Sequence, residues 1–254
     1  MSSSEVAANE NVEADTHSSY QIEERDEQAI LGLLKDIPLL EDTSADSLRR
    51  LAAASEVRTY PAGGSVFERG SQPTGLYFVV DGCVKLVVSG PDYRKRVVEL
   101  FHKGRMFGEI GVFSSLAFRT WTEATTATTL IHVDQAAFLD VIAIDHALTR
   151  RMLVTVTARI QHLIDAIGAT SHHSADARIA AYIFELAESD KTDTEHEFKV
   201  TLPTTKTTIA SLLNLSQESL SRALGRMRNT ELLHVHGRRL HVRDPRRLRE
   251  LAGR

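Results

Sequence analysis

The sequence has very little cysteine and no long uncharged apolar run. Cys83 is the only cysteine among 254 residues, which excludes a disulfide framework, a cysteine-ligated zinc site and a four-cysteine iron–sulfur cluster. No uncharged apolar stretch reaches the roughly 18 residues of a membrane-spanning helix. The first ten residues have neither a basic nor an apolar segment. We therefore expect no signal peptide, no membrane partner and a cytoplasmic protein.

The formal net charge of −4 conceals two ends of opposite charge. Residues 1–30 carry eight acids and one base, a net charge of −7, whereas residues 201–254 carry eleven bases and four acids, a net charge of +7. A basic end combined with an acidic tail is typical of proteins that bind nucleic acid. The start of the chain has almost no large apolar side chains, so we predict a disordered acidic tail over residues 1–25.

Two different patterns follow the tail. Residues 55–134 contain short β-branched or aromatic runs separated by glycine, a pattern that predicts a small β-barrel or sandwich. Glycine and proline are then absent from 135–167, which predicts a long helix. Its apolar residues recur at the spacing of a coiled coil, so we predict dimerisation through Leu153, Val156, Ile160, Leu163 and Ile167. The alternative is a helix packed only on the β-domain of its own chain.

The basic end has the layout of a helix-turn-helix. Two helical patterns flank residues 214–216, and Ser216 is a good N-cap for the second helix. A hairpin over 232–242, with its turn at Gly237, follows as a wing, and Asp244-Pro245 begins a final short helix. The alternative is a small α/β domain with a basic surface.

The exposed side chains of this region suit contacts with DNA. Arg222 can pair with guanine and Glu218 can accept from cytosine, although Glu218 also suits the helix N-terminus electrostatically. Arg226 is expected to contact a phosphate or to be solvated, and Arg238 and Arg239 at the wing tip to contact phosphates. The predicted DNA-binding residues are Lys206, Gln217, Glu218, Ser221, Arg222, Arg226, Arg238 and Arg239.

A candidate effector site lies in the β-domain. Gly108 permits close approach of a ligand to the backbone, Glu109 can accept from a sugar hydroxyl, and Arg119 with Thr120 can bind a phosphate. The alternative is a structural ion pair between Glu109 and Arg119 in an empty pocket. We find no Ser/His/Asp arrangement, HExxH or P-loop, and therefore predict that the protein is not an enzyme.

Two of these segments resemble the Crp/Fnr family of transcription regulators. The run 107–109 followed by Arg119-Thr120 is similar to the family's phosphate-binding cassette, and 217–222 resembles the Glu-x-x-Ser-Arg recognition helix of its Fnr-like branch. The resemblance implies an α+β fold in three parts: a jelly-roll-like β-roll effector domain over 26–140, a dimerisation helix over 141–168 and a winged helix-turn-helix over 169–254. It also implies a homodimer on palindromic double-stranded DNA with TTGA-like half-sites, and contact with RNA polymerase if the protein is an activator.

The effector is less well defined by the resemblance. The predicted effector-binding residues are Gly108, Glu109, Ile110, Arg119, Thr120, Leu163 and Ile164. Leu163 and Ile164 replace the Thr-Ser pair that contacts the base in cyclic-AMP-binding members, and Phe118 replaces a frequent proline. A cyclic nucleotide resembling cyclic AMP, haem bound by a histidine such as His132, His162, His172 or His173, and a ligand-independent regulator therefore stay open. No metal site is predicted, and Cys83 alone cannot hold an iron–sulfur cluster.

Overall fold

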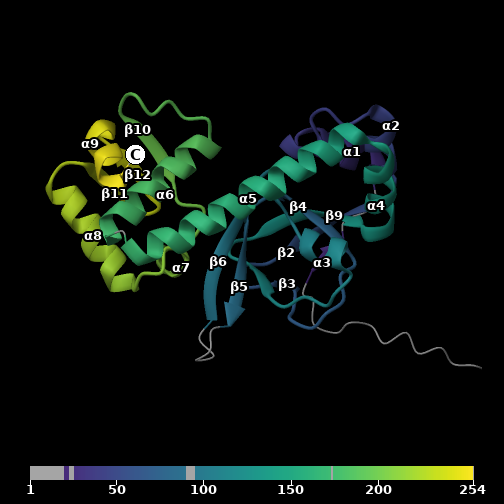
Figure 1. Ribbon diagram of the computed structural model, residues 1–254, viewed down its shortest axis with the longest axis horizontal. Coiled ribbons are helices and arrows are strands. Elements are labelled where there is room, and N and C mark those ends of the chain that lie inside the picture. The colour runs from purple at the N-terminus through teal and green to yellow at the C-terminus, as the bar shows by residue number, and fades with distance from the viewer. Residues whose placement is uncertain (1–19, 23–25, 90–94, 173, 254) are drawn as a thin grey trace, which may run out of the picture.

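The computed structural model describes residues 20–22, 26–89, 95–172 and 174–253, with the backbone alone at 162 and 165–172. Figure 1 shows two lobes connected by the long helix α5 (His146–His172). The first lobe is rich in strands and the second consists of helices around a small sheet. The predicted α+β class, with a β-roll, a long helix and a winged helix-turn-helix, is confirmed.

Two antiparallel sheets form the β-roll. One has the strand order β1-β2-β9-β4-β7 and the other β3-β8-β5-β6. Side chains alternate along β4, so that Tyr77 and Val79 enter the cluster that contains Phe101 while Leu76 and Phe78 face the helices. The strands are β1 (Gln21–Ile22), β2 (Ser55–Tyr60), β3 (Ser65–Phe67), β4 (Gly75–Asp81), β5 (Cys83–Ser89), β6 (Lys95–His102), β7 (Met106–Phe107), β8 (Trp121–Ala124) and β9 (Thr128–Asp134).

Short helices cover one face of the first sheet. Their apolar side chains, such as Leu34, Leu51 and Phe138, form one cluster with Leu148 and Met152 of α5. Asp26, Ser44 and Asp134 cap three of these helices by accepting from backbone amides of the first turn. The elements are α1 (Glu27–Lys35), the 3₁₀ helix η1 (Pro38–Leu40), α2 (Ala45–Ala53), α3 (Glu109–Ser114) and α4 (Gln135–Ile144).

The predicted acidic tail ends in a strand. Residues 1–19 and 23–25 lie outside the described residues, but Gln21–Ile22 form β1 and pair antiparallel with β2. The ring of Tyr20 lies 5.4 Å from that of Tyr60, and the Arg58 guanidinium lies 4.7 Å from the Tyr20 ring. These aromatic and cation–π contacts hold residues 20–22 on the edge of the sheet.

The second lobe is built on helix α6 (Ala175–Ser189). Its sheet has the order β10-β12-β11, with β10 (Phe198–Thr201), β11 (Leu233–His236) and β12 (Arg239–Val242). The helices α7 (Lys206–Leu212), α8 (Gln217–Asn229) and α9 (Pro245–Ala252) pack around a core that includes Ile183, Leu224 and Leu240. Ser174, Thr205, Ser216 and Asp244 cap α6, α7, α8 and α9 respectively.

The two lobes share one apolar core. Cys83, Val87, Val97 and Leu100 of β5 and β6 belong to the same buried cluster as the side chains of the second lobe. Across this contact the backbone amide of Val97 donates to Oγ of Ser211 in α7 at 3.0 Å. No helix in the part of the chain that the structure describes is long and apolar enough to cross a membrane.

Candidate functional site

The candidate effector residues begin at the turn into α3. Gly108 has φ +94°, a conformation that disfavours an L side chain, and a Cβ there would lie 3.2 Å from both the carbonyl oxygen of Gly75 and Cδ2 of Tyr77. The turn therefore requires glycine. It places Glu109 as the first residue of α3, buried with 5% of its surface exposed, and leaves Ile110 exposed.

Glu109 is bonded to the long helix and not to Arg119. Nη1 of Arg159 in α5 donates to Oε1 of Glu109. Both Nε and Nη2 of the same guanidinium lie 2.7 Å from Oε2 of Glu99 in β6. The guanidinium carbon is also 4.9 Å from the centroid of the Phe101 ring. We call Glu99, Arg159 and Glu109 the carboxylate–arginine cluster.

This cluster has one more negative than positive charge and is almost entirely buried. The side chains of Glu99 and Glu109 are each 6% exposed and that of Arg159 is 11% exposed. Oε1 of Glu99 and Oε2 of Glu109 have no hydrogen-bond partner among the described residues. Burial raises the pKa of Glu109, and the attraction of Arg159 offsets this only in part. Two buried acceptors are therefore available to a hydrogen-bond donor.

The proposed phosphate-binding residues lie outside the cluster. Arg119 is exposed and makes no hydrogen bond or ion pair within the described ranges, and Thr120 is half-buried. Phe118 precedes them and stacks on Phe67, with the ring centroids 3.7 Å apart, beneath Gly111. The stacking of Phe118 thus leaves Arg119 on the surface, where its guanidinium is free to bind an anion.

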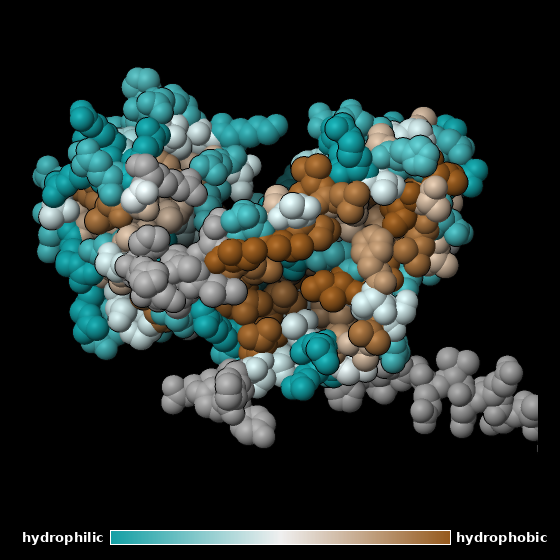
Figure 2. Space-filling model, in the orientation of Figure 1, coloured by the Kyte–Doolittle hydropathy of each residue, from teal (hydrophilic) through white to brown (hydrophobic). Residues whose placement is uncertain are grey.

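The long helix presents an apolar face to solvent. Leu153, Ile160 and Ile164 are exposed by 64%, 53% and 56%. Val156 and Leu163 are half-buried, and Val156 packs against the core of the first lobe. The side chain of Ile167 lies outside the described residues. Figure 2 shows apolar side chains gathered along α5 and over the neighbouring α3 region, where Ile110, Phe113 and Leu116 are also exposed.

Helices α7 and α8 have the arrangement of a helix-turn-helix. Asn214 adopts a left-handed conformation, φ 54°, in the turn, and Ser216 accepts from the amide of Ser219. Gln217, Glu218, Ser221 and Arg222 are exposed on the first two turns of α8. Nη1 of Arg222 donates to Glu218 at 2.6 Å, and the hydroxyl of Thr207 donates to Gln217 at 3.1 Å. These residues form a continuous exposed polar surface.

The other predicted DNA contacts differ in their freedom. Arg226 pairs with Asp176 of α6, so its charge is already engaged within the lobe. Lys206 is half-buried at the start of α7. Arg238 and Arg239 are exposed beside Gly237, although Nη1 of Arg238 also donates to the carbonyl of Pro203 at 3.4 Å.

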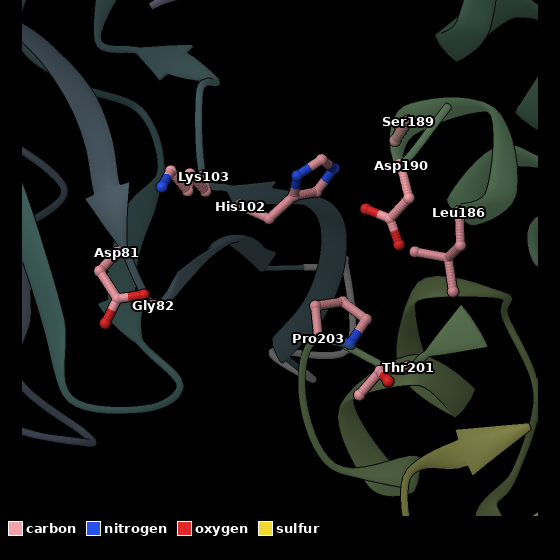
Figure 3. Close-up of a pocket in the computed structure, with 9 residues that line it drawn as sticks. All are labelled: Asp81, Gly82, His102, Lys103, Leu186, Ser189, Asp190, Thr201 and Pro203. Carbon is pink, nitrogen blue, oxygen red and sulfur yellow. The ribbon is translucent and has the colours of Figure 1, made fainter. Parts of the chain in front are cut away.

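A cavity of about 350 Å³ lies between the two lobes, away from Glu109. In Figure 3 His102, on the side of the first lobe, faces Asp190 of the second. Burial, and to a smaller extent the charge of Arg105, lowers the pKa of His102. The cavity is lined by Asp81, Gly82, His102 and Lys103 from the β-roll and by Leu186, Ser189, Asp190, Thr201 and Pro203 from the second lobe.

The candidate haem ligands do not form a group. His132 is buried and its Nε2 lies 3.0 Å from Oγ1 of Thr74, while the side chains of His162, His172 and His173 lie outside the described residues. Cys83 is buried in the core shared by the lobes. Within the described ranges, no group of three or more His, Cys, Asp and Glu side chains is placed to hold a metal ion.

Sequence reasoning missed the two residues that complete the carboxylate–arginine cluster. Glu99 is a single acid inside the apolar run 97–101, and Arg159 directly precedes Ile160 of the predicted apolar stripe. A lone charge in an otherwise apolar strand is the signal that identifies Glu99, because a buried carboxylate requires a partner. Arg159 carries no such signal, since a charged residue on a helix is usually solvated.

A β-roll with a charged site against a long helix, joined to a winged helix-turn-helix, defines a DNA-binding transcription regulator. The model of the cyclic nucleotide-binding domain matches residues 57–145, and that of the Crp-like helix-turn-helix domain matches residues 177–251. The chain therefore belongs to the Crp/Fnr family of transcription regulators, which are not enzymes.

The relatives and solved structures agree with this assignment. The chain is 22% identical over 187 residues to the cAMP-activated global transcriptional regulator CRP of Escherichia coli, covering 73% of this chain and 89% of that protein. It is 23% identical over 189 residues to the CRP-like cAMP-activated global transcriptional regulator of Mycobacterium tuberculosis, covering 74% and 84%. The structure of FixK2 from Bradyrhizobium japonicum superposes with a TM-score of 0.69 at 22% identity, covering 78% of this chain and 96% of that one.

Proposed function

We propose that the chain is a homodimeric, sequence-specific DNA-binding regulator whose affinity for DNA is set by a small effector of the cyclic-nucleotide type. The observation that carries this proposal is the carboxylate–arginine cluster, because Arg159 belongs to the helix of the proposed dimer contact and binds two carboxylates of the effector domain. A ligand that competes for Glu109 or Arg159 acts directly on that helix. Such coupling requires the ligand to bind one state better than the other.

The dimer contact of the proposal is the exposed apolar face of α5. Leu153, Ile160 and Ile164 lie at intervals that place them on one side of the helix. Apolar side chains of this size, exposed in a row, are typical of a helix that packs against a second copy. Two α8 helices in such a dimer meet successive major grooves, which fits a palindromic site with TTGA-like half-sites.

The effector contact of the proposal uses the available oxygen of Glu109. Oε2 of Glu109 is buried and without a partner among the described residues, so it suits a sugar hydroxyl. Arg119 and Thr120 are the proposed phosphate contacts, and Leu163 and Ile164 offer the base an apolar contact without hydrogen bonds. As a DNA-binding regulator, the protein is assigned to the cytoplasm in this proposal, with RNA polymerase as a further partner if it activates transcription.

Two experiments test this proposal. Selection from a pool of random duplexes with the purified full chain is expected to enrich a two-fold symmetric sequence, whereas an asymmetric or absent motif contradicts the dimeric recognition. Mass spectrometry and an absorption spectrum of the purified protein then identify any bound nucleotide or haem, and titration with cyclic AMP and cyclic GMP follows the DNA affinity. An affinity that no ligand changes favours a ligand-independent regulator.

A further inference from the structure

The second carboxylate of the cluster gives this site an unusual charge. Nε and Nη2 of Arg159 face Glu99, and Nη1 faces Glu109, so both edges of the guanidinium are engaged by the protein itself. One positive charge thus serves two buried carboxylates. Arg105 lies 3.9 Å from Oε1 of Glu99 but is half exposed, so it neutralises the excess charge only weakly.

This arrangement opposes a negatively charged ligand. A phosphate that approaches Arg159 has to replace the Glu99 carboxylate, and a phosphate beside Glu109 is repelled by both acids at short range in a poorly solvated site. A neutral sugar meets no such penalty, because its hydroxyls donate to the available oxygens of Glu99 and Glu109. We propose that Glu99 is a specificity-determining residue, which lowers the affinity of the effector site for anionic nucleotides relative to neutral, donor-rich ligands.

This inference rests on the proposed effector site, and it assigns the charge preference of that site to a residue outside the predicted set. Glu99 also positions Arg159 from the β-roll. A merely structural role would change the affinity for every ligand equally. The charge role changes the affinity for an anion far more than that for the matching neutral molecule, so the ratio of the two affinities separates the roles.

Calorimetric titration of the full-length chain with cyclic AMP and with adenosine measures this ratio. In the unaltered protein, cyclic AMP is expected to bind no more tightly than adenosine. Glu99→Gln keeps the shape of the side chain and its contact to Arg159 but removes the charge. It is expected to raise the affinity for cyclic AMP roughly tenfold while changing that for adenosine little.

Glu123→Gln is the matched control, because Glu123 is a carboxylate of β8 that pairs with Lys85 at 2.6 Å and is not part of the cluster. It is expected to leave both affinities unchanged. The inference is overturned if the unaltered protein binds cyclic AMP clearly more tightly than adenosine, a comparison that needs no variant. It is also overturned if Glu99→Gln changes both affinities equally or binds neither ligand. Because binding is measured without DNA, failure of the proposed regulation of DNA affinity does not affect this result.

Discussion

The backbone amide of Val97 in β6 donates to Oγ of Ser211 in α7 at 3.0 Å, and this hydrogen bond links the effector domain to the first helix of the helix-turn-helix. Lys95 and Arg96 precede Val97 in β6, and apolar side chains of β5 and β6 share a buried core with the second lobe. A shift of β6 is therefore transmitted to α7 without passing through α5.

Ser211→Ala is expected to loosen this contact by about 1 kcal/mol, since a partly buried amide loses its acceptor. Hydrogen-exchange mass spectrometry of the peptide that contains Val97 measures the effect as faster exchange. Ser71→Ala serves as the control, because the Ser71 hydroxyl donates only within its own loop. Unchanged protection of Val97 in Ser211→Ala contradicts the importance of this bond. Trp121, the single tryptophan, packs against the shared core, so its fluorescence offers a second readout.

Arg222→Ala is expected to weaken binding to the specific site by about 1–3 kcal/mol and to relax the base preference at one position, because a guanidinium reads guanine through two hydrogen bonds. Its pair with Glu218 is exposed, with side-chain exposures of 61% and 74%, so the variant should fold normally. Fluorescence anisotropy with specific and random duplexes measures both affinities. Arg246→Ala, at an arginine of α9 that is 93% exposed, is the matched control. An equal loss on both duplexes would make Arg222 a phosphate contact.

Ile160→Glu is expected to convert the dimer to a monomer, because it places a charge in the centre of the exposed apolar face of α5. Sedimentation velocity measures the change of mass, and the affinity for a palindromic site should fall at least about tenfold with it, since the two half-sites are then bound separately. Ile144→Glu provides a comparison at an equally exposed position, 56%, of α4. If Ile160→Glu remains dimeric, the face of α5 is not the contact.

The buried His132 predicts a dependence of stability on pH. Burial, followed by the charge of Arg58, lowers the pKa of His132 to about 3, whereas an unfolded chain binds the proton near pH 6.5. The unfolded state therefore binds more protons below that pH, and the free energy of unfolding should fall by roughly 1.4 kcal/mol per pH unit between about pH 6.5 and 3.

Urea unfolding at pH 7.5, 6.0 and 5.0 tests this dependence. His132→Gln can keep the hydrogen bond to Thr74 but does not titrate, so its stability should fall less steeply than that of the unaltered protein. His234→Gln, at an exposed position of β11, should leave the slope unchanged. Equal slopes in His132→Gln and the unaltered protein would mean that His132 is protonated in the folded state.

Local signals in the sequence predicted the elements of the second lobe well. Ser216 and Asp244 were predicted as the starts of α8 and α9, and both side chains cap those helices. Caps and turns depend on neighbouring residues alone, so they are visible in the sequence. The strands of the β-roll were visible for the same reason, because runs such as 83–88 combine β-branched residues with flanking glycine.

The charge partners were not predictable in the same way. Glu109 pairs with Arg159, which is 50 residues away in the chain, and Arg159 also pairs with Glu99, 60 residues away. Such pairs form only once β6, α3 and α5 are packed, and periodicity contains no information about that packing. The docking of the second lobe on β5 and β6 and the pair between Arg226 and Asp176 arise similarly from tertiary contacts.

The most direct test of the account is the affinity of the full-length protein for a duplex with two inverted TTGA-like half-sites, measured by anisotropy at one fixed salt concentration beside a duplex with one half-site scrambled and a fully scrambled duplex. The account predicts that the complete site binds at least about a thousandfold more tightly than the scrambled duplex, with the single half-site between them. Equal affinity for all three duplexes would contradict it.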